Sequence, residues 1–268
     1  TAFKTNNVDH CTRLCHASSV AALLQSVGSA AVTAPFTAAK DAECIIVIGA
    51  RPEQNHPVAA SYLKQAVKSG SKLIIMDPRK QNLSRYATHH LQFNPGQDLS
   101  LLNAMIYTII EEGLIDEDYV KNNTEGFELL EKEIKSFNPK IMEKICGINS
   151  EIIKEVARLY AKSKTSIIFW GMGISQHVHG TQNAFCLINL ALITGQVGRD
   201  GTGLHPLRGQ NNVQGASDAG LIPMSYPDYQ RVDVNKNLSE MESFWNATLD
   251  PDEGKTVVEI IEDIYSNK

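Results

Sequence analysis

Two cysteines and a histidine near the amino terminus form the first cluster that could do chemistry, in the run from Cys11 to His16 (CTRLCH). Two thiols four residues apart and a histidine could ligate zinc, but no second ligand pair in the sequence has suitable spacing. A cysteine beside a histidine could instead be an activated thiolate. The third interpretation is a buried cysteine next to a surface histidine, and these residues alone favour it.

An arginine between small and amide residues is the second candidate. Arg208 lies in residues 207–212 (LRGQNN), a run typical of a loop. Its planar guanidinium fork can hold a carboxylate through two parallel hydrogen bonds, so this loop could bind an anion. The alternative is an arginine in a surface salt bridge, which is common and weak.

Two histidines one residue apart, His177 and His179, form the third candidate. Their spacing could suit a metal ion. Such a pair more often lies at the start of a helix with one side chain in solvent, and the sequence leaves both possibilities open.

Strands and helices must position these residues, and the sequence indicates where they lie. Short β-branched runs predict strands at residues 44–49, 72–77 and 165–170, of the kind that is covered on both faces. A fourth short strand is expected at 90–93. Periodicity, proline and glycine positions predict helices at 57–68, 99–112, 180–194 and 255–265, and several between 117 and 164, the last capped by Asn149 or Ser150. Residues 195–215 are expected to form a glycine-rich loop, and the chain from Tyr226 to be largely irregular.

The ends of three predicted strands, at Gly49, Asp77 and Trp170, should share one edge of a parallel sheet, where open α/β sheets bind ligands. A helix start after Gly49 would attract phosphate, and Asp77 stands where an acid commonly binds a ribose hydroxyl. However, no G-x-G-x-x-G follows Gly49, and Gly171-Met172-Gly173 is only half of one. The spacing leaves nucleotide binding and a plain α/β domain equally open.

Composition narrows the class of protein. The chain has 268 residues, of which 43% are hydrophobic, enough to bury a sizeable core, and its formal net charge is −5 with no basic block. A nucleic-acid binder that works by neutralising phosphates is therefore excluded, and a small-molecule ligand or protein partner is favoured. Five irregularly spaced cysteines indicate a reduced compartment, the cytoplasm. No run reaches the ~18 apolar residues of a membrane span.

Taken together, these segments closely resemble the motifs of molybdopterin-dependent formate dehydrogenases. Residues 6–20 (NNVDHCTRLCHASSV) resemble the active-site segment, and residues 207–218 (LRGQNNVQGASD) resemble the second signature, in the same order and separation. Residues 169–173 (FWGMG) and 77–79 (DPR) also match. The similarity extends from Asn6 to about Tyr226, and motifs of this length in this order are highly specific.

The resemblance implies roles for individual residues. Cys15 occupies the position of the cysteine or selenocysteine that coordinates molybdenum or tungsten, His16 matches the histidine proposed to take the proton, and Arg208 matches the arginine that holds formate. Other residues fall in loops that resemble those cradling two molybdopterin guanine dinucleotides: Gly49, Arg51, Gln54, Asp77, Arg79, Gly96, Asp98, Gly171, Met172, Gln176, Gly209 and Gln210. The family's usual His-Gly-Pro is here His16-Ala17-Ser18, a variation that resembles the NAD-linked cytoplasmic members.

The resemblance also implies an architecture and partners. We expect an α/β fold, with a mostly parallel sheet and helices on both faces, the Rossmann-like domain of these oxidoreductases. Residues 11–210 would form the molybdopterin dinucleotide-binding domain, 1–10 the edge of a neighbouring α/β domain, and 211–268 a partly irregular return segment. Electrons from formate would leave through a 4Fe–4S cluster outside this chain to electron-accepting subunits, such as NAD-linked iron–sulfur or flavin subunits. As a central fragment, the chain alone is expected to be inactive.

Two other functions stay open. The first is a different molybdopterin oxidoreductase, such as a nitrate reductase, which can also use a cysteine ligand; the Cys15–His16 pair and the Arg208 loop favour formate. The second is a nucleotide-binding or interaction module without catalysis of its own, in which Cys15 would be a bystander. Metal content and turnover of the intact protein separate these functions from formate oxidation.

Overall fold

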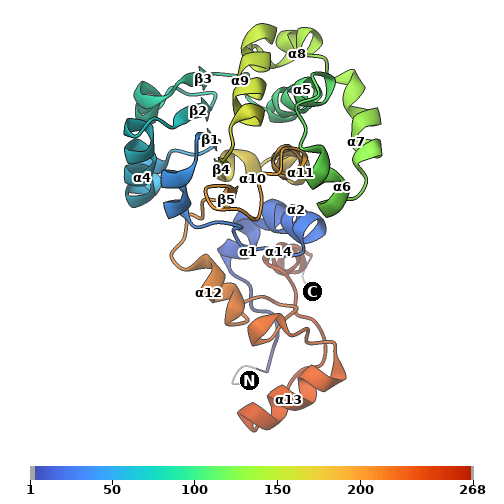
Figure 1. Cartoon of the computed structure of the whole chain (residues 1–268). Helices are drawn as coiled ribbons and strands as arrows, with labels where there is room; N and C mark the ends of the chain where they lie inside the picture. The colour runs from blue at the N-terminus through green and yellow to red at the C-terminus, as the bar shows by residue number, and fades with distance from the viewer. Residues whose placement is uncertain (1–3, 267–268) are drawn as a thin grey trace. The chain divides into compact units, whose positions relative to one another are not determined.

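A parallel sheet organises most of the chain. The computed structural model describes residues 4–266, and within them five strands pair in the order β3-β2-β1-β4-β5 (Figure 1). The strands are β1 (Cys44–Ile48), β2 (Lys72–Met76), β3 (His89–Leu91), β4 (Ser166–Trp170) and β5 (Gly203–Pro206). Every pairing between them is parallel. The predicted strands at 44–49, 72–77, 90–93 and 165–170 are confirmed to within a residue or two at their ends.

Successive side chains along each strand point to opposite faces of the sheet. They therefore contribute in turn to two hydrophobic cores, one on each face. Ile46, Ile74 and Ile168 lie in register and belong to one core. Their neighbours Ile45 and Leu73 belong to the other. All of these side chains are fully buried, and burial of such a side chain stabilises the fold by about 1.5–3 kcal/mol. The β-branched runs therefore form strands that helices cover on both faces.

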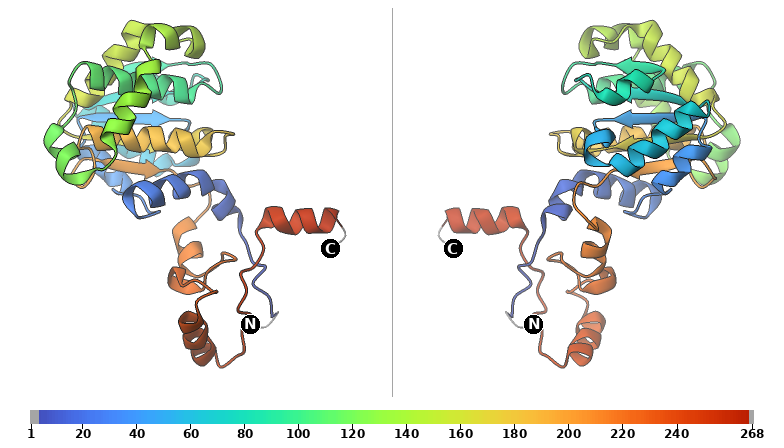
Figure 2. Two further views of the ribbon diagram at one scale, coloured as in Figure 1. Left: turned by 90° about the vertical axis from the view of Figure 1, so that its right-hand side faces the viewer. Right: turned by 90° about the vertical axis from the view of Figure 1, so that its left-hand side faces the viewer.

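Helices cover both faces of the sheet (Figures 1 and 2). On one face lie α5 (Asp98–Glu111), α8 (Pro139–Cys146), α9 (Ser150–Lys162) and α11 (Gly180–Ile193), and on the other lie α4 (Pro57–Lys68) and the 3₁₀ turn Phe36–Asp41. The remaining helices of this part are α2 (Ala17–Val27), α3 (Pro52–Asn55), α6 (Glu117–Asn123), α7 (Phe127–Glu133) and α10 (Met172–Ser175), with 3₁₀ turns at Asn82–Tyr86 and Ile134–Ser136. The expected α/β architecture with helices on both faces is confirmed.

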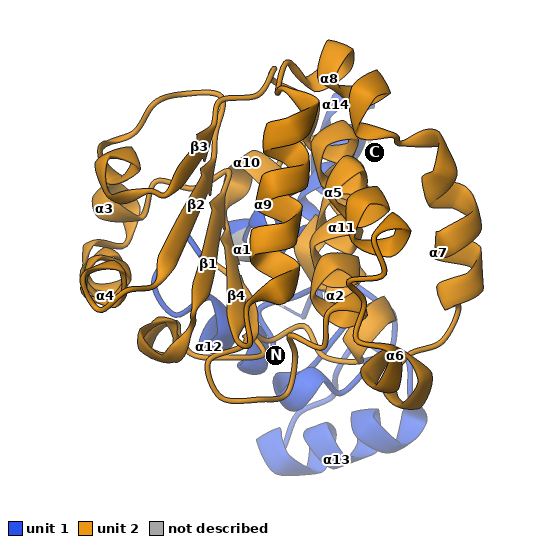
Figure 3. Cartoon of the chain, turned by 45° about the horizontal axis from the view of Figure 1, so that its top comes forward, with its two compact units in different colours: residues 1–17, 208–268 blue, residues 18–207 orange. Residues whose placement is uncertain are grey.

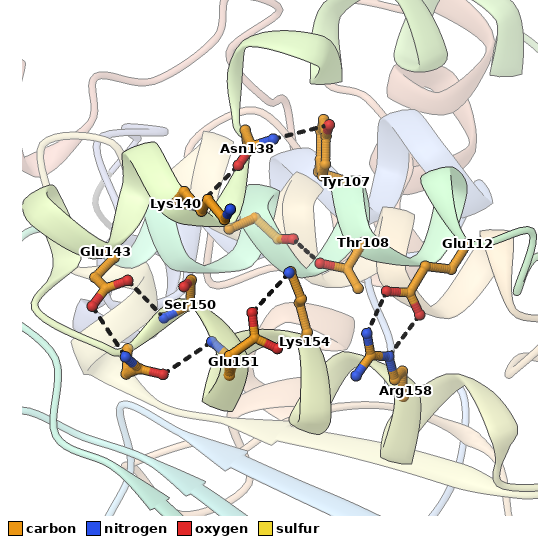
Figure 4. A network of polar contacts seen from close by, with 12 residues as sticks. Tyr107, Thr108, Glu112, Asn138, Lys140, Glu143, Ser150, Glu151, Lys154 and Arg158 are labelled. Atoms are coloured by element: carbon orange, nitrogen blue, oxygen red, sulfur yellow. Dashed lines mark hydrogen bonds and ion pairs between the residues drawn. The ribbon is translucent and has the colours of Figure 1, made fainter.

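Polar contacts join α5, α8 and α9 on the outside of this layer (Figure 4). Asn149 caps α9 by accepting a hydrogen bond from the backbone N–H of Glu151 at 3.0 Å, as one of the two predicted caps. A carboxylate oxygen of Glu143 accepts from the Ser150 N–H at 3.1 Å, which links the end of α8 to the start of α9. Arg158 of α9 forms a two-pronged pair with Glu112 after α5, at 2.6 and 2.7 Å. These contacts hold α5, α8 and α9 together on one face of the sheet.

The chain divides into two compact units, shown in two colours in Figure 3. The larger unit, residues 18–207, holds the whole sheet. The smaller unit combines residues 1–17 with residues 208–268 and contains α1 (Cys11–Cys15), α12 (Val213–Asp218), the 3₁₀ turn Pro227–Tyr229, α13 (Asn235–Trp245) and α14 (Val257–Tyr265). No helix among residues 4–266 is long and apolar enough to cross a membrane.

Some elements differ from the sequence-based expectation, and β5 and α13 are two of them. β5 lies inside residues 195–215, which were expected to form a loop, and α13 lies in the stretch expected to be irregular. β5 begins with Gly203, whose φ is +151°, and ends with Pro206, so no run of β-branched residues marks it as a strand. β5 exists because it pairs with β4, and Pro206 is tolerated because β5 is an edge strand.

Candidate functional site

Residues far apart in the sequence meet around Cys15 in the smaller unit. Cys15 is the last residue of α1 and is 6% exposed. The backbone N–H of Gly209 is hydrogen-bonded to its thiol, and the Arg208 guanidinium lies close enough for the two groups to act on each other's charge. The structure therefore brings three of the sequence-predicted residues, Cys15, Arg208 and Gly209, into one group.

The electrostatics of this group suit a ligand that brings its own charge. Burial raises the pKa of the Cys15 thiol, helped by neighbouring Cys11, and the Gly209 hydrogen bond and Arg208 oppose that rise only in part. Burial likewise lowers the pKa of Arg208, although an arginine remains protonated at neutral pH. A bound metal cation would convert such a thiol into a thiolate, and the half-buried guanidinium would attract a small anion.

The other two candidates in the smaller unit differ in exposure. His16 follows Cys15 directly, and its side chain is fully buried. Gln210 follows Gly209, and its side chain is exposed. His16 thus lies in the chain beside the thiol, whereas Gln210 offers its amide to solvent or to a ligand.

A buried aspartate fixes the helix that carries Cys15. Asp9, with a side chain 2% exposed, accepts hydrogen bonds from Arg13 of α1 at 2.7 and 2.5 Å and from the backbone N–H of Val257 at 2.9 Å. The first residue of α14 is therefore bound to the segment just before α1. Figure 2 shows the amino-terminal segment lying beside the chain that leads into α14.

Two asparagines add further hydrogen bonds between the amino-terminal segment and the segment before α14. The Asn6 amide donates to the backbone carbonyls of Asp250 and Asp252 at 2.9 and 2.7 Å, and the Asn7 side chain accepts from the Lys255 N–H at 2.7 Å. In the sequence, Asn6 and Asn7 are recognisable only as parts of a motif. Their role as anchors is visible only in the structure, because the partners follow about 250 positions later.

We expect Asp9→Asn to loosen α1. Burial alone would raise the pKa of Asp9, but hydrogen bonds from Arg13, Val257 and His10 outweigh it and lower that pKa. The charged form therefore stabilises the fold above the ordinary aspartate pKa of about 3.9, and that contribution is lost as pH falls through the lower, folded-state pKa. At pH 7 the amide of Val257 should exchange its hydrogen at least about tenfold faster in the variant, a loss of ~1.4 kcal/mol.

Hydrogen exchange followed by mass spectrometry checks this prediction at pH 7 and pH 3, with rates corrected for intrinsic exchange. The difference between the parent chain and Asp9→Asn should shrink at pH 3. Asp233→Asn is the matched control, because Asp233 also pairs with an arginine, Arg231, but is about half exposed. Equal exchange rates in the parent and Asp9→Asn at pH 7 would show that this ion pair does not hold α1.

A second group of predicted residues gathers at the carboxyl edge of the sheet in the larger unit. β1 pairs with β2 on one side and β4 on the other, so the strand order reverses between β1 and β4 at the point where α/β sheets bind ligands. The loops after these two strands touch backbone to backbone, since a Cβ on Gly173 would lie 2.7 Å from the Cα of Gly49. Gly171 is equally crowded, 2.8 Å from the Gly49 carbonyl oxygen. Only glycines allow this close approach.

A carboxylate and an amide join the loops after β1 and β2. Asp77, 8% exposed, accepts hydrogen bonds from the Arg79 N–H at 2.8 Å and from the Gln81 side chain at 3.2 Å. The same Gln81 amide donates to the carbonyl of Ala50 at 3.0 Å. Gln81 was not among the predicted site residues, although its position four residues after Asp77, at the end of a strand, could have indicated it.

A second carboxylate on this edge faces a histidine. Asp98, the first residue of α5, is 4% exposed, and the His177 ring nitrogen Nε2 lies 4.0 Å from its Oδ2. Burial raises the pKa of Asp98, and Asp77 adds to the rise, while its own backbone N–H and His177 oppose it. His177 was considered as a metal ligand, and the structure instead places it beside Asp98.

Unpartnered polar atoms mark this edge as a polar ligand site. Arg51 Nε, Gln81 Oε1 and His177 Nδ1 are buried and have no hydrogen-bond partner among residues 4–266. A buried polar group without a partner is costly, so a ligand with phosphates, hydroxyls or a base would satisfy them. The side chains of Gln54, Arg79 and Gln176, which are near these residues in the sequence, are exposed. Met172 begins α10, and Gly96 lies in the turn before α5, where a Cβ would lie 3.8 Å from Cε1 of His177. These residues fit a dinucleotide-like cofactor.

Within the described residues, protein side chains alone do not form a metal site. In the described part of the chain, no three histidine, cysteine, aspartate or glutamate residues gather as a metal site, and Cys11, Cys15 and His16 do not form a zinc site there. All five cysteines are free thiols.

The sequence of this chain is similar to sequences of known proteins. The family model described as molybdopterin oxidoreductase covers residues 2–263. The F420-dependent formate dehydrogenase subunit alpha of Methanocaldococcus jannaschii is 42% identical over 99% of this chain and 39% of that protein. Formate dehydrogenase H of Escherichia coli is 40% identical over 91% of this chain and 34% of that protein. This chain thus spans between a third and two fifths of these relatives.

A solved structure supports the same fold. Acetylene hydratase from Pelobacter acetylenicus matches with a TM-score of 0.64 and 26% sequence identity, over 72% of this chain and 26% of that chain.

Proposed function

Because this chain belongs to the molybdopterin oxidoreductase family, we propose that it forms part of a molybdenum- or tungsten-dependent formate dehydrogenase that oxidises formate to carbon dioxide or catalyses the reverse reaction. The observation that carries the proposal is the group of Cys15, Arg208 and the Gly209 N–H in the smaller unit. It combines one soft metal ligand with one anion-binding fork. Relatives named as formate dehydrogenases match along almost the whole chain.

Arg208, Cys15 and the neighbouring His16 have distinct tasks. Oxidation of formate releases one proton and two electrons, and the metal with its pterins supplies the redox chemistry when bound. Arg208 holds the two carboxylate oxygens and so fixes the direction of the C–H bond. Cys15 provides a single thiolate to a metal that its organic cofactor otherwise holds. His16 accepts the released proton from its place beside Cys15.

The cofactor we propose is a bis-molybdopterin guanine dinucleotide. Support comes from the crowded glycines, the linked carboxylates and the unpartnered polar atoms at the carboxyl edge of the sheet. Gly209 and Gln210 would contribute from the loop next to Arg208. We further propose that electrons leave through a 4Fe–4S cluster to electron-accepting subunits, and that the protein works in the cytoplasm, where free thiols persist.

Steady-state kinetics of the holoenzyme test the proposal. The purified enzyme, with its molybdenum or tungsten content measured, should turn over formate with an artificial electron acceptor and should reduce nitrate at least about 10³-fold less efficiently in kcat/KM. Efficient nitrate reduction without formate oxidation would assign the second activity of this family. A folded protein without either metal would instead indicate a non-catalytic module.

A further inference from the structure

A buried glutamine lies beside the carboxylate that follows β2 in the larger unit. Gln81 is 5% exposed and Asp77 is 8% exposed. The side-chain nitrogen Nε2 of Gln81 lies 3.2 Å from Oδ2 of Asp77 and 3.0 Å from the backbone oxygen of Ala50. A carboxylate and a carbonyl oxygen can only accept hydrogen bonds, so the amide must direct its NH₂ group at both of them. One side chain therefore uses its two hydrogens to bind the residue after β2 and the loop after β1.

This orientation leaves the other end of the amide without a partner. Gln81 Oε1 is buried and has no hydrogen-bond partner among residues 4–266. A buried acceptor without a partner costs free energy, and an apolar side chain of the same length would avoid that cost. Packing alone thus does not account for a glutamine at this position, whereas the two hydrogen bonds that it donates do.

A separate contact already attaches the two loops to each other. Glu53 of α3, in the segment after β1, accepts a hydrogen bond from the Leu83 N–H at 2.7 Å. Leu83 belongs to the 3₁₀ turn that directly follows Gln81. Because this contact joins the segments without Gln81, the contribution specific to Gln81 is its hydrogen bond to Asp77.

The two oxygens of the Asp77 carboxylate are bound by different donors. Oδ1 accepts a hydrogen bond from the Arg79 N–H at 2.8 Å, and Oδ2 accepts one from the Gln81 amide. With one donor on each oxygen, the carboxylate is restrained in a single orientation. Each oxygen of a carboxylate can accept a second hydrogen bond, so Asp77 keeps the capacity to bind two further donors of a ligand.

We propose that Gln81 is a positioning residue for Asp77, because it fixes the carboxylate in the orientation that accepts hydrogen bonds from ribose hydroxyls of the dinucleotide cofactor. The inference rests on the proposed function. Without the Gln81 amide, Oδ2 loses its donor from the protein and the carboxylate is free to rotate. The cofactor would then lose hydrogen bonds to a charged acceptor, which are stronger than those between neutral groups.

Retention of the cofactor by the purified holoenzyme tests this role. Gln81→Met keeps the length of the side chain and removes its donor. We expect this variant to lose guanine nucleotide about tenfold faster than the parent enzyme during timed incubation, with the bound fraction separated by gel filtration and measured as GMP after acid hydrolysis. Gln81→Glu keeps the shape of the side chain and also lacks the donor. It should lose nucleotide at least as fast, and it provides the same test if Gln81→Met does not fold.

A double-mutant cycle shows whether Gln81 acts through Asp77. Asp77→Asn should itself accelerate the loss of nucleotide. Adding Gln81→Met to Asp77→Asn should change that rate by no more than about twofold, because the carboxylate that Gln81 positions is already gone. If the two effects instead multiplied in the double variant, Gln81 would act independently of Asp77, and the positioning role would be overturned.

Gln92→Met is the matched control. The Gln92 amide donates to the backbone carbonyl of Pro78, the residue after Asp77, at 3.0 Å, but its side chain is exposed and binds a backbone atom rather than the carboxylate. Its replacement should leave the rate of nucleotide loss within about twofold of the parent rate. An equal acceleration in Gln92→Met and Gln81→Met would contradict a role specific to Gln81.

The nucleotide and metal content of the parent enzyme separates this inference from the proposed function. If the parent enzyme contains both and Gln81→Met loses nucleotide at the parent rate, the inference is overturned and the proposed function stays intact. A folded parent enzyme that contains no guanine nucleotide overturns the proposed cofactor itself.

Discussion

Replacing Cys15 by serine in the holoenzyme should reduce formate oxidation at least about 10³-fold, equivalent to ~4 kcal/mol of transition-state stabilisation. A thiolate is a soft, polarizable ligand, whereas a serine oxygen is hard and holds its proton far more tightly, so the electronic state of the metal changes. The fold should survive, because the substitution exchanges sulfur for a smaller oxygen at a site where the Gly209 N–H can still donate.

Metal analysis, circular dichroism and steady-state kinetics together measure this effect. Cys11→Ser is the matched control, since Cys11 lies one helical turn earlier on α1 and is exposed. That control should retain activity close to that of the parent enzyme. If Cys15→Ser turned over formate at a near-normal rate with full metal loading, Cys15 would be a packing residue.

Arg208→Lys should lower kcat/KM for formate by about 10²-fold or more, on the scale of ~3 kcal/mol. Formate offers only two carboxylate oxygens and one C–H bond, so its orientation depends on how those oxygens are held. Lysine retains the charge but cannot form the two parallel hydrogen bonds of a guanidinium. Because the C–H bond then points in the wrong direction, kcat should fall as well as KM rise.

Measurements of kcat and KM at equal metal and pterin content check the Arg208 prediction. Arg158→Lys serves as the control, because Arg158 also makes a two-pronged pair, with Glu112, but on an exposed helix of the larger unit. It should leave formate kinetics unchanged. A value of kcat/KM for Arg208→Lys within a few-fold of the parent enzyme would make Arg208 a structural arginine.

Local sequence patterns predicted the centre of the sheet because its strands are short β-branched runs. Ile46 and its neighbours are buried on both faces, so their identity alone indicates a central strand. β5 has no such run, since Gly203 begins it and Pro206 ends it, and its existence depends on pairing with β4. Central strands can thus be predicted from their residue composition, whereas an edge strand such as β5 depends on its pairing with a neighbouring strand.

The candidate site was predictable in a different way. Spacing placed Asp77 and Gly171 at strand ends, but only the resemblance to a family connected Cys15 with Arg208. The supporting residues escaped prediction because their partners lie far away in the chain or in a turn. Gln81 bridges two loops, and Asp9 binds the backbone of Val257. Such contacts cannot be predicted from local sequence patterns.

The hydrogen bond between Asp9 and Val257 has a consequence for biosynthesis. The larger unit is continuous in sequence and can fold once residue 207 has left the ribosome, whereas the smaller unit needs both of its segments. At ~5–20 residues per second, α1 and Cys15 wait on the order of 10–50 s for the segment that anchors them. During that interval the larger unit can already be folded, while α1 still lacks the segment that anchors it. Anchoring of α1 through Asp9 therefore waits until residue 257 has been synthesised.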